Sequence, residues 1–345
     1  MKILANAYSL PAFQITTEWI LQKLRTRNSA RMNDSELERL LAKVDDLLAS
    51  AGSDTKRQAG EHERGLDFAV DAGRQAIAKC DVDAREIDLL LYTSVGRGWL
   101  EPATANVVQQ ELGLPNATAF DILDGCAGWL RALEVARAYA ASGAYRKCMI
   151  VTCECGLAEF GRWDFDSADN IDAYLATYTI GEAATATIVS TDDTDDDFYF
   201  RFRNFGQYAD LCMIPLQTAD QFLPGGSDTP VVPMKFFARS GELMSTAIAK
   251  IVETYRSDPT LRSQSYDLAV GHAASEKAGD AVRRELGLPK QTYFPTHRRY
   301  GNTVAASIPL ALGLAEEQGR LERGNKVLAV SGASGITVGI GSFTY

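Results

Sequence analysis

The chain has 345 residues, of which 46% are hydrophobic, and carries a formal net charge of −10 at pH 7. This length allows one large domain or two fused ones with a substantial apolar core. The acidic balance disfavours nucleic acid as a partner, and no run of 18 or more apolar residues predicts a membrane span. The start of the chain does not resemble a signal peptide, and the six cysteines follow no regular framework. We therefore expect a reduced, cytoplasmic protein.

The first sixty residues predict one strand and two helices. Residues 2–10 form a strand-like run, and Trp19 to Leu24 mark a short helix. The sequence Ser35-Glu36-Leu37-Glu38 has the pattern of a capping box, which predicts that a second helix begins there. Leucines continue along that helix at helical spacing, which favours a face that packs on the body of the protein. A lid or a dimer arm is the alternative interpretation.

From residue 67 onward, predicted helices alternate with apolar strands. The expected helices cover 67–79, 102–112 and 127–141, and the expected strands cover 87–93, 118–122, 148–153, 181–189, 198–203, 266–271 and 326–331. Several of these strands are continuously apolar, as is typical of strands that are buried on both faces. This alternation predicts an α/β fold.

Cys126 lies in a Gly-Cys-Ala-Gly turn between a predicted strand and an Ala-rich helix. Unpaired backbone N–H groups and the helix dipole at such a position favour a thiolate over a thiol. Gly125 and Gly128 allow other backbone segments to approach closely. A buried structural cysteine is the alternative, which the residues described next make less favourable.

The second half of the sequence repeats the first. The run that begins at Tyr266 resembles the run that begins at Ile87, and the run at Lys326 resembles the run at Lys147. Asp267 stands 179 residues after Asp88, and Gly335 stands 179 residues after Gly156. Two pairs with one offset indicate an internal duplication, in which loops at equivalent strand ends converge on a shared site.

His272 and Asn302 lie at such ends in the second half. His272 follows a buried strand at the position equivalent to Thr93, and Asn302 begins the helix that pairs with the Cys126 helix. Each alone is more often structural, but together with Cys126 they indicate a covalent thioester site. Cysteine attacks a carbonyl, while the histidine and the asparagine donate hydrogen bonds to the oxygen that becomes negative. His297 is expected in a loop and has no assigned role.

These motifs resemble the thiolase superfamily, specifically the condensing enzymes that are similar to β-ketoacyl-acyl-carrier-protein synthase III. The matching segments span residues ~65–345 and are Asp-Gly-Cys-Ala-Gly (124–128), Gly-His-Ala-Ala-Ser (271–275), Tyr-Gly-Asn-Thr-Val-Ala-Ala-Ser (300–307) and the tail from Ser331 to Gly339. The resemblance implies a duplicated five-layer α-β-α-β-α fold. Its halves would be residues 1–190, with Cys126 and a helical insertion at about 12–60, and residues 191–345, with His272 and Asn302.

The resemblance also implies a role for each site residue. Cys126 would carry the acyl group, His272 and Asn302 would hold the acceptor's thioester oxygen, and the backbone N–H groups of Cys126 and Ser334 would form the other oxyanion hole. We expect no metal and no permanently bound cofactor; the substrates would be acyl-CoA or acyl-carrier-protein thioesters. The segments that bind coenzyme A near the N-terminus in this family have no clear match in this sequence. A donor thioester bound to a carrier protein therefore agrees with the sequence at least as well as a coenzyme A thioester.

A carrier protein could dock on basic residues of the second half, although these could equally form a solvated helix face. The candidates are Lys277, Arg283, Arg284 and Lys290.

Glu101 stands in Leu-Glu-Pro-Ala-Thr-Ala, residues 100–105. This motif resembles enzymes that join two acyl chains head to head, namely olefin-pathway, pyrone and dialkylresorcinol ketosynthases. In those enzymes the glutamate reaches across a homodimer and deprotonates the α-carbon of one acyl chain, because a thioester without a carboxyl group to lose needs a base. The alternative is that Glu101 only caps a helix that begins at Pro102.

The sequence therefore predicts a homodimeric ketosynthase that joins two acyl or β-ketoacyl thioesters through acyl-Cys126, in polyketide or other secondary-metabolite biosynthesis. Two alternatives remain at this point. One is an acyltransferase of the same fold that serves an oxygen or nitrogen acceptor. The other is a catalytically silent partner subunit that sets chain length, which the presence of Cys126, His272 and Asn302 disfavours.

Overall fold

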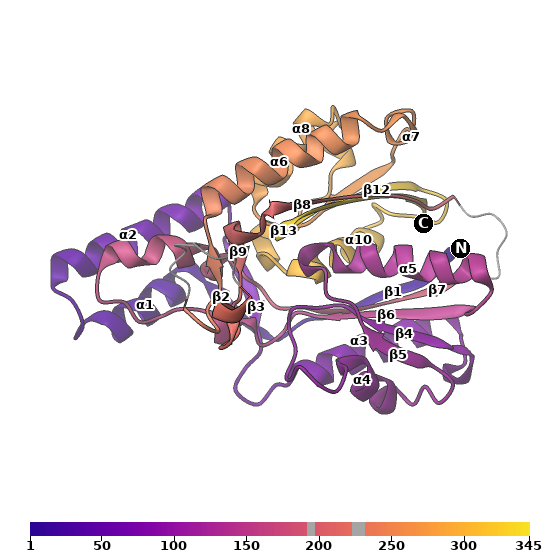
Figure 1. The fold of residues 1–345 in the computed structure, drawn as a ribbon, viewed down its shortest axis with the longest axis horizontal. Helices are drawn as coiled ribbons and strands as arrows, with labels where there is room; N and C mark the ends of the chain where they lie inside the picture. The colour runs from indigo at the N-terminus through magenta and orange to yellow at the C-terminus, as the bar shows by residue number, and fades with distance from the viewer. Residues whose placement is uncertain (192–196, 223–231) are drawn as a thin grey trace.

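The computed structural model describes residues 1–191, 197–222 and 232–345, and its elements form five layers (Figure 1). Helices α5 (Gly128–Ser142) and α10 (Ser307–Glu317) lie between two sheets. Helices α3 (Gly65–Cys80) and α4 (Thr104–Leu112) cover the outer face of one sheet, and α6 (Ser240–Arg256) and α8 (Glu276–Glu285) cover the other. The predicted α-β-α-β-α fold is therefore confirmed.

The first sheet has five strands in the order β1-β7-β6-β4-β5. Its members are β1 (Lys2–Ser9), β4 (Leu89–Tyr92), β5 (Thr118–Asp121), β6 (Lys147–Cys153) and β7 (Ala184–Ser190). Strands β5, β4 and β6 are parallel, and β7 and β1 run antiparallel to their neighbours. Strands β4 and β7 are buried along their whole length, because helices cover both faces of the sheet.

The second sheet has four strands in the order β11-β12-β13-β8. Its members are β8 (Tyr199–Tyr208), β11 (Leu268–Gly271), β12 (Lys326–Ala333) and β13 (Gly335–Thr344). Strand β11 is parallel to β12, and the remaining pairs are antiparallel.

The strand register confirms the internal duplication. Leu89 on β4 pairs with Cys148 on β6, and 179 residues later Leu268 on β11 pairs with Val327 on β12. The hydrogen bonds after each strand repeat as well: Thr93 donates its N–H to Val151 at 2.9 Å, and His272 donates to Val330 at 2.9 Å. The repeat therefore places His272 at the same end of its sheet as Thr93.

The middle layer supplies the largest core. From Ser307 to Ala315, every residue of α10 is buried. Trp129 of α5 is also fully buried, and its indole Nε1 donates to Thr187 Oγ1 on β7 at 2.9 Å. A helix that is apolar all round is stable only when it is enclosed, and each fully buried leucine contributes about 1.5–3 kcal/mol. This packing fixes the N-terminal ends of α5 and α10, which carry the site.

Residues 12–60 form a helical arm on the left of Figure 1, made of α1 (Thr17–Asn28) and α2 (Asp34–Ala51). The leucine face of α2 packs against the 3₁₀ segment η4 (Ala168–Thr179), so the expectation that it packs on the body is confirmed.

The predicted capping box at Ser35 is wrong. Asn33 is the cap and accepts from the Glu36 N–H at 3.0 Å, while the Glu36 carboxylate accepts from the Ala168 N–H at 3.1 Å.

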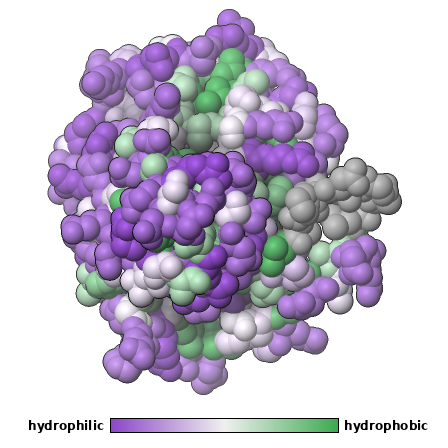
Figure 2. Space-filling view, turned by 90° about the vertical axis from the view of Figure 1, so that its left-hand side faces the viewer, coloured by the Kyte–Doolittle hydropathy of each residue, from purple (hydrophilic) through white to green (hydrophobic). Residues whose placement is uncertain are grey.

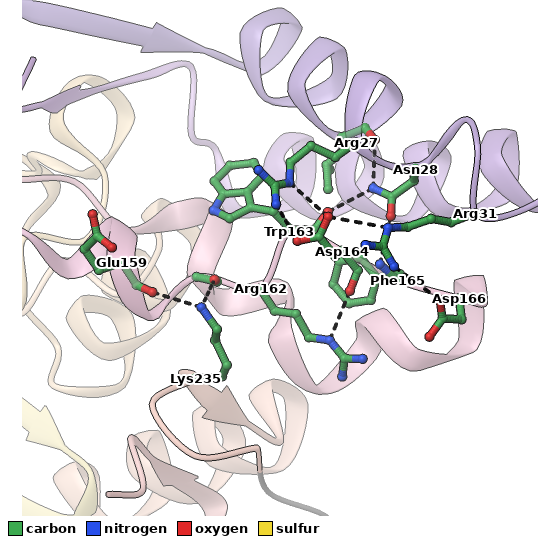
Figure 3. A network of polar contacts seen from close by, with 12 residues as sticks. Arg27, Asn28, Arg31, Glu159, Arg162, Trp163, Asp164, Phe165, Asp166 and Lys235 are labelled. Atoms are coloured by element: carbon green, nitrogen blue, oxygen red, sulfur yellow. Dashed lines mark hydrogen bonds and ion pairs between the residues drawn. The ribbon is translucent and has the colours of Figure 1, made fainter. Parts of the chain in front are cut away.

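A polar network joins the end of α1 to residues 162–166 (Figure 3). The buried Asn28 donates to Leu24 O at 2.7 Å and to Trp163 O at 2.9 Å, and it accepts from the Phe165 N–H at 2.8 Å. Arg27 beside it forms a two-pronged ion pair with Asp164. The arm is thus attached by specific polar contacts as well as by its leucines.

The remaining elements are short. They include the antiparallel pair β2 (Phe13–Thr16) and β3 (Thr55–Gln58), the pair β9 (Cys212–Met213) and β10 (Phe237–Ala238), and helices α7 (Pro259–Arg262) and α9 (His297–Tyr300). Figure 2 looks onto the end formed by the arm, where hydrophilic residues predominate and apolar ones form small separate patches. Across the described ranges, no helix is long and apolar enough to cross a membrane.

Candidate active site

Cys126 lies in the 3₁₀ turn η2 (Gly125–Ala127), between β5 and α5. Gly125 has a φ of +50°, a conformation that glycine adopts without strain, and its α-carbon faces Ser334. A Cβ at Gly128 would come within 2.1 Å of Thr93 Oγ1, so glycine is needed where α5 meets the end of β4. Ser331 on β12 donates its hydroxyl to Cys126 O at 2.9 Å. Both halves therefore hold this turn.

The sequence predicted a lowered pKa for the Cys126 thiol, but the structure indicates a raised one. Burial, followed by the negative charges of nearby groups that include Glu154, raises the pKa of Cys126 well above its ordinary value. The regular helix begins only at Gly128, so Cys126 does not occupy its first turn. The thiol is consequently protonated in the free protein at neutral pH, and it must lose its proton during the attack.

His272 follows β11 and faces the same interior space as Cys126. Its Nε2 lies 2.9 Å from Asn302 Oδ1. An amide oxygen only accepts hydrogen bonds, so this contact is a hydrogen bond when the proton of the neutral imidazole is on Nε2. Burial lowers the pKa of His272, which keeps the ring neutral at pH 7. A neutral N–H donor is the form that can stabilise a developing oxyanion.

Asn302 precedes the 3₁₀ turn η8 (Val304–Ala306), and its backbone is fixed to residues 179–181 of the other half. Its N–H donates to Thr179 O at 2.8 Å, and its carbonyl accepts from the Gly181 N–H at 3.0 Å. The side-chain Oδ1 accepts from the Val304 N–H at 2.9 Å as well as facing His272. Its NH₂ group is thereby left as the donor for a substrate oxygen.

A single cavity of about 390 Å³ connects these groups. Its wall includes Cys126, His272, Asn302 and Ser334, so the structure brings together four of the residues predicted for catalysis and the oxyanion hole. The rest of the wall is mostly apolar, which suits an alkyl chain better than a polar substrate.

Glu154 is a buried residue near Cys126 that the sequence reasoning missed. It follows β6, it is completely buried, and its carboxylate accepts from the N–H groups of Val95 (3.2 Å), Gly96 (2.9 Å) and Ala305 (3.2 Å). Burial raises its pKa to about 7, against the opposing effect of these hydrogen bonds. The only signal in the sequence was a charged residue directly after a buried strand.

Glu101 is exposed and is not among the described residues that line the cavity of its own chain. The expected helix start at Pro102 is wrong, because α4 begins at Thr104. Asp121, and not Glu101, caps this helix: its carboxylate accepts from the Thr104 N–H at 2.9 Å and from the Ala105 N–H at 2.8 Å. The capping role considered for Glu101 is therefore taken by another residue.

The proposed docking residues do not share one environment. Lys277, Arg284 and Lys290 are exposed, whereas the Arg283 side chain is only 13% exposed and lines the cavity. Arg283 donates to Leu288 O at 2.7 Å and pairs with Asp280.

His297 and Cys153 have structural surroundings. His297 was expected in a loop but is buried at the start of α9, where its Nδ1 lies 2.7 Å from Ala273 O and supports the residue next to His272. Cys153 Sγ donates to Gly65 O at 3.1 Å. Over residues 1–191, 197–222 and 232–345, no group of three or more His, Cys, Asp or Glu side chains could hold a metal ion.

Comparisons with known proteins agree with this geometry. Residues 120–204 match the family model 3-oxoacyl-[acyl-carrier-protein] synthase III, and residues 257–345 match the model of its C-terminal part. Two curated relatives are the β-ketoacyl-[acyl-carrier-protein] synthases III of Neisseria meningitidis and Aliarcobacter butzleri. The first is 28% identical in a match that covers 95% of this chain and 93% of the relative. The second is 29% identical in a match that covers 91% of this chain and 93% of the relative.

Solved structures share the fold. Cerulenin-bound OleA of Xanthomonas campestris superposes with a TM-score of 0.83 at 20% identity, covering 99% of this chain and 96% of its own. The 3-oxoacyl-[acyl-carrier-protein] synthase III of Aquifex aeolicus superposes with a TM-score of 0.78 at 22% identity, covering 100% and 99%. The two family models match segments from both halves of the fold that form the cavity. The chain therefore belongs to the β-ketoacyl-acyl-carrier-protein synthase III-like condensing enzymes of the thiolase superfamily.

Proposed function

We propose that this enzyme joins two acyl thioesters by a Claisen condensation through an acyl group carried on Cys126. The observation that carries the proposal is the single apolar cavity lined by Cys126, His272 and Asn302. A nucleophile and two neutral donors around one space are what thioester condensation requires.

In the first step, the Cys126 sulfur attacks the carbonyl carbon of an acyl thioester. The carbon–sulfur bond to the donor breaks, and the donor leaves as a thiol with the proton that Cys126 gives up. The oxyanion formed on the way would be held by the backbone N–H groups of Cys126 and Ser334, and Gly125 allows these two segments to approach. Each such donor contributes about 10²–10³ in rate.

In the second step, an acceptor thioester binds with its carbonyl oxygen at the Asn302 NH₂ group and at His272 Nε2, whose N–H would turn from Asn302 Oδ1 to the substrate oxygen. Donation from both groups stabilises the enolate that forms when the α-carbon loses a proton. The α-carbon then attacks the carbonyl carbon of acyl-Cys126, a carbon–carbon bond forms, and the bond between this carbon and the Cys126 sulfur breaks. The sulfur leaves as a thiolate and takes up the proton that the base had removed, which regenerates the thiol. Secondary-metabolite biosynthesis remains our proposal for the setting.

The base in this step would be Glu101 of a partner subunit. Two contacts tie the Glu101 loop to the segment that carries Cys126: Arg97 pairs with Asp121 at 3.5 Å, and Asp121 caps the helix at Thr104. Trp99 and Leu100 on this loop are 40% and 72% exposed, and Leu123, which lines the cavity, is 66% exposed. In an isologous homodimer that covers these apolar residues, the loop of each subunit would approach the Leu123 side of the other cavity.

The donor would be an acyl-carrier-protein or an acyl-CoA thioester. One solved structure of Xanthomonas campestris OleA contains lauric acid and lauroyl-CoA, which shows what that relative binds. In this chain, Lys277 and Arg284 extend from α8, the helix that also lines the cavity, and could meet an acidic carrier protein at that edge.

Intact mass spectrometry tests the acyl intermediate. The protein should gain one acyl group on incubation with an acyl thioester, and Cys126→Ala should gain none. Cys148→Ala is the matched control, because Cys148 is a buried thiol on β6 that does not line the cavity, and it should be acylated as the wild type is. An adduct that persists in Cys126→Ala, or none in the wild type with any donor, would contradict the proposal.

A further inference from the structure

We propose that Cys153 and Cys155 are a redox-active pair of thiols, which a hydroperoxide oxidises to a disulfide, and that this change loosens the loop at Val95 and Gly96. Both cysteines are free and buried, and neither is among the described residues that line the cavity. The proposed condensation uses the thiol of Cys126 alone. The inference therefore concerns a second thiol site and goes beyond the proposed function.

The two side chains lie together against the first residue of α3. Cys153 Sγ donates to Gly65 O at 3.1 Å, and a hydrogen bond joins the thiols of Cys153 and Cys155. A Cβ on Gly65 would come within 3.1 Å of Cys155 Cβ and within 3.4 Å of Cys153 Sγ. Alternate residues of an extended segment point to the same side, which explains why both cysteines reach the same point of the helix.

The surroundings give the two sulfurs different roles. The hydrogen bond to Cys153, followed by burial, raises the pKa of Cys155 well above its ordinary value. Cys155 therefore keeps its proton, and the sulfur of Cys153 is the one available to attack. A negative charge on Cys153 would be stabilised by the Cys155 S–H and by the N-terminal end of α3, whose helix dipole favours an anion.

Oxidation of the pair takes two steps. The Cys153 thiolate attacks an oxygen of the hydroperoxide, the oxygen–oxygen bond breaks, and the alcohol leaves with the proton that Cys153 gave up. Cys153 is then a sulfenic acid. The Cys155 sulfur attacks the sulfur of this acid, a sulfur–sulfur bond forms, and the hydroxide leaves as water with the proton of Cys155. In total the two thiols lose two electrons and two protons, and the hydroperoxide is reduced to an alcohol and water.

Closing the disulfide would bend the segment that contains Glu154. Alternate α-carbons of an extended strand are about 6.6 Å apart, near the upper limit for a disulfide, so ring closure draws residues 153 and 155 together. Glu154 points to the opposite side, where its carboxylate accepts from the N–H groups of Val95 (3.2 Å), Gly96 (2.9 Å) and Ala305 (3.2 Å). Bending would tilt the carboxylate away from these groups, and the two longer hydrogen bonds would be lost first.

The loop at Gly96 also lies directly on the backbone of this segment. A Cβ on Gly96 would come within 2.6 Å of Cys153 O and within 2.8 Å of Cys155 O. The Tyr92 hydroxyl lies 2.5 Å from Gly96 O and 3.2 Å from Cys153 O, so it holds the loop and the segment together. Because closely packed groups transmit displacements, a bend at the cysteines should disturb the loop that continues to Glu101.

Peptide mass spectrometry tests the pair, with hydrogen peroxide as the probe. The full chain is oxidised, its remaining thiols are blocked with N-ethylmaleimide in denaturant, and the peptide that contains both cysteines is measured. In the wild type this peptide should lose two hydrogens and escape labelling until dithiothreitol is added. Cys155→Ala should give a sulfinic acid on Cys153 in place of the disulfide, and Cys153→Ala should leave Cys155 unoxidised. Cys148→Ala, which removes a lone buried thiol of β6, is the matched control and should form the disulfide as the wild type does.

Hydrogen exchange tests the effect on the loop. Oxidation should speed exchange of the Val95 and Ala305 amides about tenfold in the wild type, as expected when a hydrogen bond is lost, and should leave it unchanged in Cys155→Ala. A pair of cysteines that remains as fully labelled as Cys148 after peroxide would overturn the redox site. A disulfide without faster exchange would overturn its control of the loop. Neither measurement requires acylation of Cys126, so either proposal can fail while the other stands.

Discussion

Glu154 and Ala305 stand 151 positions apart, and the Ala305 N–H donates to the Glu154 carboxylate at 3.2 Å. The same carboxylate accepts from Val95 and Gly96. One buried side chain therefore connects the loop that leads toward Glu101 with the segment that follows Asn302. It fixes two parts of the proposed site that lie in different halves of the fold.

The raised pKa of Glu154 predicts an unusual pH dependence of stability. Its pKa is about 7 in the folded protein and ~4.5 when unfolded, so between these values the folded state binds more protons. The free energy of unfolding should then fall as pH rises from 5 to 7, by about 2 kcal/mol from this group. In Glu154→Gln this decline should disappear. Urea unfolding of both proteins at pH 5 and pH 8 measures it, and parallel pH profiles would contradict the assignment.

The raised pKa of Cys126 predicts slow alkylation at neutral pH. Since only the thiolate reacts, the rate of modification by iodoacetamide should rise about tenfold for each pH unit between 7 and 9. The measurement is the rate at which the Cys126 peptide is labelled, with Cys126→Ala as the blank. A rate that is already at its plateau at pH 7 would show that the start of the helix lowers the pKa of this thiol after all.

Periodicity predicted an α/β fold and the repeat predicted two similar halves, because apolar strands and enclosed helices follow local rules of burial. The five layers were implied only by the family resemblance. The offset between Thr93 and His272 could be read from the sequence, since duplicated strands keep equal spacing. Cys126, His272 and Asn302 were found because each follows a central element whose partner is known from the repeat. Their shared cavity required the structure.

Long-range polar contacts were not predictable from one sequence. Nothing in the residues around Asp121 indicates that its carboxylate, and not Glu101, caps the helix at Thr104. In the same way, Asn33 and not Ser35 caps α2, and the Glu36 carboxylate bonds to Ala168 far along the chain. The protonation of Cys126 depends on burial by both halves, which local sequence does not report.

The attachment of the helical arm predicts unequal costs for two neighbouring residues. Asn28→Ala removes three hydrogen bonds, two of them buried, and leaves the Phe165 N–H unpaired, so it should lower the free energy of unfolding by about 2–4 kcal/mol. Arg27→Ala removes an exposed ion pair with Asp164 and should cost less than about 1 kcal/mol. Thermal unfolding compares the variants, with hydrogen exchange across residues 17–51 as the local measurement. Equal costs would mean that the leucines of the arm alone hold it.

The position of Glu101 outside its own cavity predicts complementation between subunits. Glu101→Gln should retain acylation of Cys126 but lose condensation by about 10²–10⁴-fold, the usual contribution of a general base. Cys126→Ala should lose both activities. When the two variants are mixed and allowed to exchange subunits, half of the mixed dimers' sites contain an intact Cys126 facing an intact Glu101, so condensation should return. Glu111→Gln, a change at an exposed glutamate on α4, is the matched control and should leave condensation unaffected. Condensation at the wild-type rate by Glu101→Gln alone would remove Glu101 from the mechanism, and a mixture that remains inactive would place the base within the same subunit.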